Sequence, residues 1–448
     1  MKRLFIALVI LFIPACGSSR DVFPTAIIPV PDMATSTIER IIAPSPAPQA
    51  TDTPLPQTTV SPTETEVPRT TQAALTKLQP GENVTITSIQ MLDSENGWAL
   101  ESKYHILHTQ DGGNAWQDVT PPQGTYMASG FFAIDSKTAW ATFFTEFYQP
   151  IPSTFVWYTL DGGQSWQASQ PFPVNLDREG KDVPNGYYRL QQLYFVDRQN
   201  GWLLVDVYYG MHSTRLLLFR TQDGGKTWAV INDHYHDLHK AAGIGVAFIN
   251  PEEGWYGQND IRFQWISLRI DEIIETGGWK LPKTLDGGRS FTEFTLLPLP
   301  AELRKPQFAG KSADCGETRM LTIAPSMIGV EWTCWIYTEP RQDYSFYALT
   351  GDNGQSWHSW LATGNEFFLN AQTGWRLSTT ANTRELQQTS DGGINWLPVK
   401  SVAWQAAQFD FVSEQVGWAI VQNDNATAFI RTTDGGKTWA EISPVITQ

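Results

Sequence analysis

The chain has 448 residues, of which only 17% are charged, and it contains 35 glycines, 28 prolines and 19 tryptophans. This length suits two or three ordinary domains or one large repeat array, and the composition favours short strands with tight turns over a helical protein. The formal net charge of -15 argues against nucleic acid or anionic lipid as the main partner, because both require a basic face.

Residues 1–16 are typical of a signal peptide, because Lys2 and Arg3 precede an apolar run that ends at Cys16. Small residues before a cysteine at this point resemble the bacterial lipobox, in which the cysteine is lipidated and becomes the mature N-terminus. We therefore expect a lipid anchor at Cys16 and a location in the bacterial cell envelope, outside the cytoplasm. The alternative is an ordinary cleaved signal with an incidental cysteine.

Residues 17–78 form a second segment, which is rich in Pro, Thr, Ser and Ala and has no hydrophobic period of a helix or a strand. Such a stretch cannot bury enough apolar surface to offset its ordering entropy. It predicts a disordered spacer with polyproline II character. We expect this spacer to hold a folded domain, residues 79–448, away from a membrane surface.

One phrase, Thr-x-Asp-x-Gly-x-x-aromatic, recurs seven times in the folded region. A turn aspartate accepts hydrogen bonds from nearby backbone N–H groups, and glycine takes up a positive φ at little cost. The aromatic ring can then bury about 150 to 250 Å² on the next strand. The phrase predicts a self-capped hairpin turn and not a repeated active site, and its aspartates are Asp111, Asp161, Asp223, Asp286, Asp352, Asp391 and Asp434.

A second phrase, an apolar strand, a short polar turn and a tryptophan, precedes most of these turns, as in "LDSENGWAL" and "VDRQNGWLL". Each unit then has four strands, A to D, with the tryptophan opening strand B and the Asp turn joining C to D. Units roughly 40 to 65 residues apart predict an all-β, seven-bladed propeller of four-stranded antiparallel blades. The fifth unit has lost the Gly-Trp phrase. The first strand begins near Val84 and the last ends near Ile442, which leaves open whether the ring closes by strand exchange.

The repeated phrase is similar to the Asp-box, or BNR, repeat of sialidases, sortilin-type receptors, some glucanases and the photosystem II assembly and stability factors. The pairing of "NGWAL" with "HTQDGGNAW" resembles the last family and its uncharacterised bacterial relatives most. This resemblance covers about residues 79–448 and implies a propeller that handles membrane-associated proteins. Those relatives present an arginine-rich patch, whereas this chain is acidic and has no arginine between Arg69 and Arg178.

A sialidase-like enzyme is the sharpest catalytic alternative. The resemblance implies that such an enzyme holds its substrate carboxylate with three arginines, the first in an Arg-Ile-Pro phrase. This sequence lacks that phrase, so Tyr187, Tyr188 and Arg189 offer a nucleophile without an anion clamp. The repeat aspartates serve as turn caps, and no separate carboxylate pair for glycoside hydrolysis stands out. We therefore expect no catalytic activity and no cofactor.

The segment "DHYHDLH" gathers His234, His236 and His239 beside two aspartates. His-x-His on an extended segment points both rings to one side, and such a set could hold a divalent metal. We favour the alternative, a polar, solvated loop between the third and fourth blades. No second motif completes a ligand set.

The folded region has two cysteines, Cys315 and Cys334. Disulfides persist in exported proteins, so we expect these two cysteines to pair. Both lie in the irregular fifth unit, where a covalent link would help to hold the strands.

Loop lengths point to a functional face. The A–B and C–D turns are short, whereas the B–C and D–A connections vary, and the two classes lie at opposite ends of a meander. Aromatic side chains on variable loops of a rigid scaffold suit protein or glycan recognition, although they also suit simple packing against the blade ends. We expect a monomer that binds a protein, with a glycan as the alternative and a purely structural role as a third; the candidates are Tyr148, Phe155, Tyr208, Tyr209, His212, Tyr235, Phe263 and Trp265.

Overall fold

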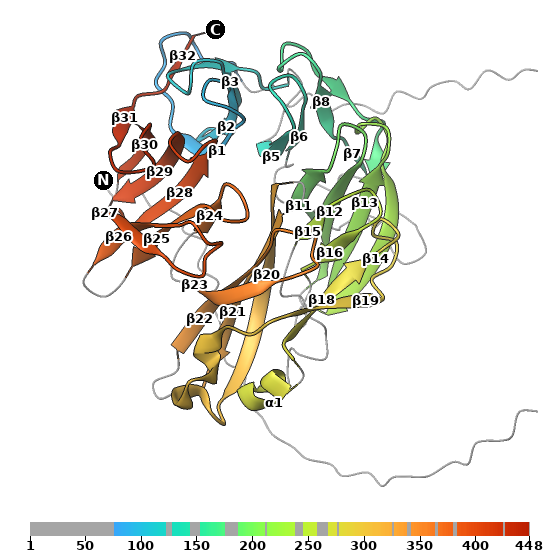
Figure 1. Cartoon of the computed structure of the whole chain (residues 1–448). Coiled ribbons are helices and arrows are strands. Elements are labelled where there is room, and N and C mark those ends of the chain that lie inside the picture. Colours follow the sequence, from blue (N-terminus) through green and yellow to red (C-terminus); the bar gives the residue numbers. More distant parts are fainter. Residues whose placement is uncertain are drawn as a thin grey trace, which may run out of the picture. The chain divides into compact units, whose positions relative to one another are not determined.

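The structure is a computed structural model that describes residues 76–121, 128–143, 153–174, 187–210, 213–237, 245–257, 268–275, 277–324, 327–337, 342–362, 366–379, 383–423 and 426–447. Within these ranges nearly all regular structure is β-strand (Figure 1). No helix in them is long and apolar enough to cross a lipid bilayer. The expected signal peptide, Cys16 and the spacer up to residue 75 lie outside the described residues.

Seven blades follow one another along the chain, each built on an antiparallel meander. Blade 1 consists of β1 (Ile86–Met91), β2 (Gly97–Glu101), β3 (Ile106–Thr109) and β4 (Ala115–Asp118). Blade 2 consists of β5 (Ala128–Ala133), β6 (Ala139–Phe143), β8 (Trp157–Thr159) and β9 (Gln167–Ala168), while β7 (Ser153–Thr154) pairs with β10 (Phe172–Pro173). Blade 3 consists of β11 (Tyr187–Phe195), β12 (Gly201–Gly210), β13 (Ser213–Thr221) and β14 (Ala229–Asp237).

Blades 4 to 7 complete the predicted seven-bladed propeller. Blade 4 consists of β15 (Val246–Phe248), β16 (Gly254–Tyr256), β18 (Trp279–Thr284) and β19 (Glu293–Leu297). Blade 5 consists of β20 (Ser312–Ala324), β21 (Met327–Ile336), β22 (Gln342–Thr350) and β23 (His358–Ala362). Blade 6 consists of β24 (Glu366–Phe368), β25 (Gly374–Thr379), β26 (Arg384–Thr389) and β27 (Leu397–Ser401). Blade 7 consists of β28 (Ala406–Phe411), β29 (Gly417–Asn423), β30 (Ala426–Thr432) and β31 (Ala440–Ile442).

The core lies between the blades. Among the described residues, the buried apolar side chains form seven clusters, and each cluster joins two neighbouring blades. The cluster between blades 7 and 1 contains Trp418 and Phe429 on one side and Ile89 and Trp116 on the other, which closes the ring. A blade has two apolar faces, so it is covered on both only when it has a neighbour on each side.

The two ends of the described chain meet at blade 1. Strand β32 (Val445–Ile446) pairs in parallel with β4, placing Ile446 opposite Trp116. On its other side, Ile446 accepts a 2.8 Å hydrogen bond from Gly81 N. Blade 1 therefore keeps its own four strands and gains the C-terminal strand as a fifth. This arrangement answers the question of ring closure that the sequence leaves open.

The N-terminal segment is fixed to the same blade. Leu78 N donates to Asp118 Oδ2 at 3.0 Å, and Lys77 Nζ donates to the Asp118 carbonyl at 2.8 Å. Leu78 is only 6% exposed. Lys77 and Leu78, which the sequence analysis assigns to the spacer, thus pack against the propeller.

Blade 5 is complete although it lacks the Gly-Trp phrase. The B–C connection of blade 4, which we expected to be a loop, contains β17 (Leu268–Arg269) and the short helix α1 (Ile270–Glu275). Strand β17 pairs with β20, so this insertion adds a fifth strand to the neighbouring blade. Two 3-10 helices, η2 (Ala301–Arg304) and η3 (Pro306–Phe308), precede β20.

The two ends of the strands differ. In six blades the first glycine of the Asp turn donates its N–H to a carbonyl of the A–B turn, as from Gly224 to Gln199 at 3.0 Å. The A–B and C–D turns therefore share one end of the strands, as predicted. We call this end the Asp-box face and the end with the B–C and D–A connections the variable face.

Candidate functional site

The Asp turn of blade 3 shows how the repeated phrase folds. Thr221 Oγ1 donates to Asp223 Oδ1 at 2.8 Å and accepts from Gly225 N at 2.9 Å. Thr227 donates to the same carboxylate twice, from its N to Oδ1 at 3.0 Å and from its Oγ1 to Oδ2 at 2.6 Å. Gly224 and Gly225 take φ values of 78° and 89°, which side chains strain to adopt. The threonine hydroxyl and the aspartate carboxylate of the phrase are thus used within the turn.

These bonds decide the charge of the turn aspartates. Burial raises the pKa of Asp223, but the hydrogen bonds from Thr227 and Thr221 together lower it by more than burial raises it. The pKa of Asp223 therefore lies below the ordinary value. In blade 7 the bonds from Thr438 lower the pKa of Asp434 to about 2. The carboxylates of Asp223 and Asp434 are ionised and already bonded, so they are poor candidates for general acids or nucleophiles.

Blade 1 departs from this pattern. In the other six turns, the residue four positions after the aspartate donates a side-chain hydrogen bond to the second carboxylate oxygen, over 2.5 to 2.8 Å. In blade 1 that residue is Ala115, which offers only its backbone N–H. The Oδ2 atom of Asp111 therefore keeps an acceptor site that the other turns fill.

Most strand B tryptophans join neighbouring blades through the ring N–H, a role that the sequence analysis missed, whereas Trp255 donates to Thr295 of its own blade at 2.8 Å. The Trp202 ring N–H donates to the Gly287 carbonyl in the Asp turn of blade 4 at 2.9 Å. The same bond runs from Trp140 to Gly224 at 2.8 Å, from Trp375 to Gly435 at 3.2 Å and from Trp418 to Gly112 at 2.9 Å. One Asp turn thus closes its own hairpin and accepts a bond from the blade before it.

Blade 5 replaces the missing tryptophan with two other residues. Gly329 occupies the strand B position opposite Leu349, and a side chain at Gly329 would collide with the Tyr347 hydroxyl, so Tyr347 fills that space. The hydrogen bond to the next Asp turn comes from His358, whose Nε2 donates to the Gly392 carbonyl. The sequence signal for this exchange is a histidine directly after the aromatic residue of the Asp turn. Its partner lies 34 residues away in the next blade, so the fold is needed to interpret it.

The described aromatic candidates on the variable face lie partly on strands. Phe155, between β7 and β8, is 39% exposed. Tyr208 and Tyr209 lie in β12 and Tyr235 lies in β14, so the expectation that they sit on loops is wrong. Strands B, C and D of blade 3 are longer than the phrases suggest, because pairing continues to Gly210. Four further candidates lie outside the described residues: Tyr148, His212, Phe263 and Trp265.

The histidine cluster is also on a strand. His234 and His236 belong to β14, opposite Leu216 and Thr214, so the favoured loop interpretation is wrong for these two residues, and His239 lies outside the described part of the chain. Within the described part, no three His, Cys, Asp or Glu side chains are grouped so that they could hold a metal ion.

The cysteines lie opposite each other. Cys315 on β20 is the register partner of Cys334 on β21. Cys334 is disulfide-bonded and 1% exposed. The pairing with Cys315 stays a prediction, and it would tie the first two strands of blade 5 near the end to which β17 attaches.

One His–Asp pair has the residue types of a catalytic site. His105 Nδ1 donates to Asp118 Oδ2 at 2.8 Å, and Thr120 Oγ1 donates to Asp118 Oδ1 at 2.6 Å. Burial raises the pKa of Asp118, but these bonds lower it more, to well below the ordinary range. The side chains of His105 and Asp118 are 4% and 1% exposed, so substrate cannot reach them. The pair holds Lys77 and Leu78 and is a structural anchor.

No protein-family model matches the chain, and no curated protein sequence does either. Among solved structures it is similar to one described as YCF48 bound to D1 peptide, with a TM-score of 0.42 and 13% identity over 80% of this chain and 95% of the other. YCF48 from Cyanidioschyzon merolae has a TM-score of 0.41 and 12% identity, covering 82% of this chain and 100% of that one. An α-L-arabinanase from Penicillium chrysogenum has a TM-score of 0.37 and 13% identity, covering 67% and 90%. Because these TM-scores and identities are low, the fold is assigned from the strand order and pairing of this chain and not from the similarity.

Proposed function

We propose that the protein is a lipid-anchored, extracytoplasmic binding module without catalytic activity, which holds a membrane-associated protein on the variable face of its propeller. The observation that carries this proposal is the difference between the two faces. The Asp-box face repeats one hydrogen-bonded turn seven times, whereas the other end differs from blade to blade in strand length and connections. Binding surfaces are commonly built from variable segments on a rigid scaffold.

The absence of catalysis is supported by the state of the carboxylates. The turn aspartates are bonded within their turns, and the buried Asp118 is enclosed in an anchor. The first two blades also contain no arginine that could hold a substrate anion, since none occurs between Arg69 and Arg178. The lipid anchor and the envelope location are supported by the signal at residues 1–16 alone.

The test is a crosslinking pull-down from native membranes with the anchored protein. One variant carries Phe155→Ala, Tyr208→Ala, Tyr209→Ala and Trp265→Ala on the variable face. A matched control removes exposed apolar side chains on the Asp-box face, Leu160→Ser and Ile394→Ser, which are 63% and 70% exposed. We expect a discrete protein complex with the natural chain and the control and not with the first variant. Recovery of the same complex with both variants contradicts the proposal.

The second candidate is a carbohydrate-binding surface protein, favoured by the aromatic residues on the variable face, which could stack on sugar rings. A glycan array distinguishes the two candidates. A saturable signal that disappears with the variable-face variant, together with an empty pull-down, selects the glycan. Hydrolysis of a bound glycan would overturn the non-catalytic assignment as well.

A further inference from the structure

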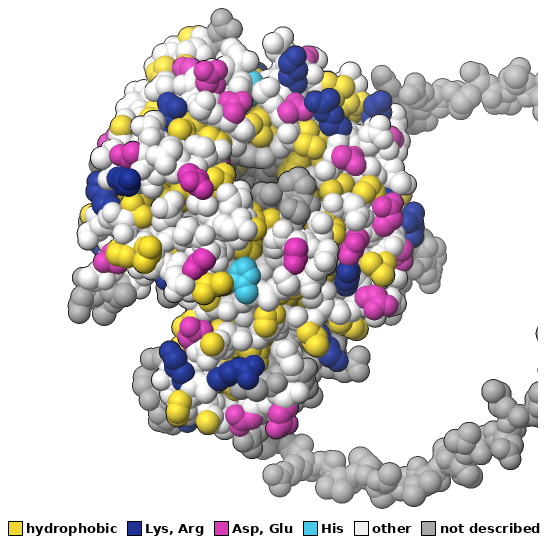
Figure 2. Space-filling model, in the orientation of Figure 1, with side chains coloured by type: hydrophobic (Ala, Val, Ile, Leu, Met, Phe, Trp, Pro, Cys, Tyr) yellow, Lys and Arg dark blue, Asp and Glu magenta, His cyan; other side chains and the backbone are white. Residues whose placement is uncertain are grey.

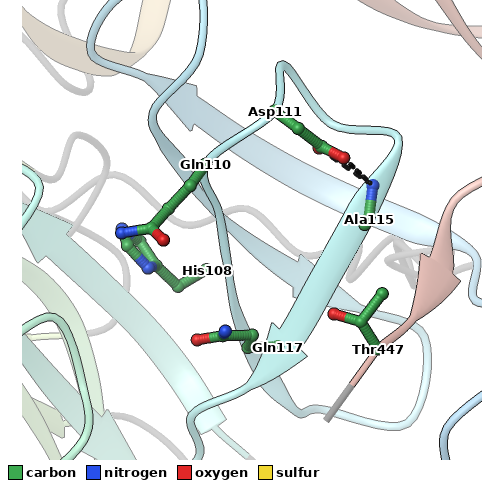
Figure 3. A pocket seen from close by; sticks show the side chains of 6 residues that line it. All are labelled: His108, Gln110, Asp111, Ala115, Gln117 and Thr447. Atoms are coloured by element: carbon green, nitrogen blue, oxygen red, sulfur yellow. Dashed lines mark hydrogen bonds between the residues drawn. The ribbon is translucent and has the colours of Figure 1, made fainter.

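A pocket lined by polar side chains lies beside the Asp turn of blade 1. A cavity of about 140 Å³ lies beside this turn, and its lining residues are His108, Gln110, Asp111, Ala115, Gln117 and Thr447 (Figure 3). A liquid water molecule takes about 30 Å³, so the cavity has room for a group of several heavy atoms. It lies on the outer strands of blade 1 and is separate from the variable face.

Two sequence changes create this pocket. The first is Ala115, which leaves Oδ2 of Asp111 without the hydroxyl or amide donor that the other six turns supply. The second is the C-terminal strand β32, which pairs with β4 and places Thr447 at the edge of the cavity, where its N–H donates to the Trp116 carbonyl at 2.9 Å. Blade 1 alone among the seven combines an alanine here with a fifth strand from the C-terminus.

The cavity lining combines one carboxylate with neutral polar groups, of which the two glutamine amides offer both acceptors and donors. Asp111 contributes a carboxylate oxygen, Gln110 and Gln117 contribute amide oxygens, and the Thr447 hydroxyl, which donates to the Trp116 carbonyl at 3.3 Å, keeps its lone pairs. His108 is 3% exposed and packs against Trp98, with ring centroids 4.6 Å apart. Burial lowers the pKa of His108, so the ring is neutral at physiological pH. The lining therefore carries one negative charge and no positive charge.

A cation with several N–H donors matches the one carboxylate of this lining and the amide and hydroxyl oxygens around it. Guanidinium has five N–H groups in a fixed fork and binds carboxylates through charge-assisted hydrogen bonds. We propose that this pocket binds the guanidinium group of an arginine side chain on an extended peptide. The arginine takes the place that a serine, threonine or asparagine side chain occupies on the turn aspartate of the other six blades.

The test uses the full-length chain with ¹³C-labelled alanine and threonine methyl groups, titrated with N-acetyl-arginine-N-methylamide at low ionic strength. We expect saturable shifts of the Ala115 and Thr447 methyl signals. The neutral analogue N-acetyl-citrulline-N-methylamide has the same shape and should bind about tenfold more weakly, because it lacks the charge. Absence of shifts with the arginine compound, or equal binding of both compounds, overturns the proposal.

Variants separate this site from a general attraction to an acidic protein. Ala115→Ser gives blade 1 the donor of the other turns, so it should weaken arginine binding about tenfold while keeping the fold, with the Thr447 methyl as the readout. Ser165→Ala frees the equivalent oxygen of Asp161 in blade 2, where no C-terminal strand forms a wall, and should not create a second site. Unchanged binding in Ala115→Ser, or a new site in Ser165→Ala, contradicts the assignment.

Discussion

Replacement of Asp410 by asparagine should stabilise the propeller at neutral pH and not at acid pH. Asp410 lies on β28 at the junction of blades 7 and 1, where its Oδ2 accepts a 2.6 Å hydrogen bond from Met91 N. Burial raises its pKa from 3.8 to about 7, and the bond from Met91 offsets only part of this effect. An asparagine oxygen can accept the same bond without carrying a charge.

The magnitude follows from the pKa difference. The folded carboxyl group keeps its proton up to about pH 7, whereas the unfolded one loses it near 3.8, so stability falls as the pH rises through this window and is constant above it. About three pKa units at about 1.36 kcal/mol each set a ceiling of about 4 kcal/mol. Asp410 is only half-buried, so we expect about 2 kcal/mol, or about 3 °C in Tm for a domain of this size.

The assay is thermal unfolding, followed by circular dichroism, of the natural chain and Asp410→Asn at several pH values between 4 and 8. The Tm difference should be near zero at pH 4 and reach its full value by pH 8. Asp434→Asn is the matched control, because hydrogen bonds from Thr438 lower the pKa of Asp434 to about 2. That variant should lose stability at neutral pH and lose less as the pH falls towards 2. A Tm difference for Asp410→Asn that does not change with pH would refute the reasoning.

Three further predictions concern the turns. Ala115→Ser should raise the free energy of unfolding by about 0.5 to 1.5 kcal/mol in urea titrations, because it completes the turn of blade 1. Trp202→Phe should lower the free energy of unfolding by about 2 to 4 kcal/mol. The Trp202 side chain is fully buried, so the smaller ring leaves a cavity and leaves the Gly287 carbonyl without its donor. His358→Phe keeps an aromatic ring but removes the ring N–H that bonds to Gly392. The hydrogen-exchange rate should therefore rise at the turn amides of blade 6, while the amides of distant blades keep their protection.

The fold could be predicted from the sequence because its rules are local. Each Asp turn uses a threonine, an aspartate and a glycine within a few residues, so the chemistry of one copy is complete in the sequence. Seven copies with an apolar strand on either side then require a ring. Even the exception in the fifth turn follows from local rules, because Asn353 takes a φ of 59° at the position where the other turns have glycine.

Features that depend on two distant segments could not be predicted. The bond from Trp202 to Gly287 joins residues 85 positions apart, and nothing in either phrase indicates the partner. The addition of β32 to β4 likewise depends on how the ring brings the two ends of the chain together. The strand content of blade 3 was underestimated because polar residues such as Asn232 and Asp233 favour turns in isolation, whereas pairing with β13 keeps them extended.

The departures from the repeat are more informative than the repeat itself. Where blade 5 loses its strand B tryptophan, Tyr347 fills the volume and His358 supplies the hydrogen bond, so the loss is compensated inside the fold. Where blade 1 loses the donor at Ala115, no described side chain replaces it, and a cavity remains beside the carboxylate. An uncompensated loss lowers stability and persists only at a tolerable cost or for another use. A serine side chain supplies the corresponding bond in three of the other turns, so the acceptor site that Asp111 keeps is the departure from the repeat on which the proposed arginine site rests.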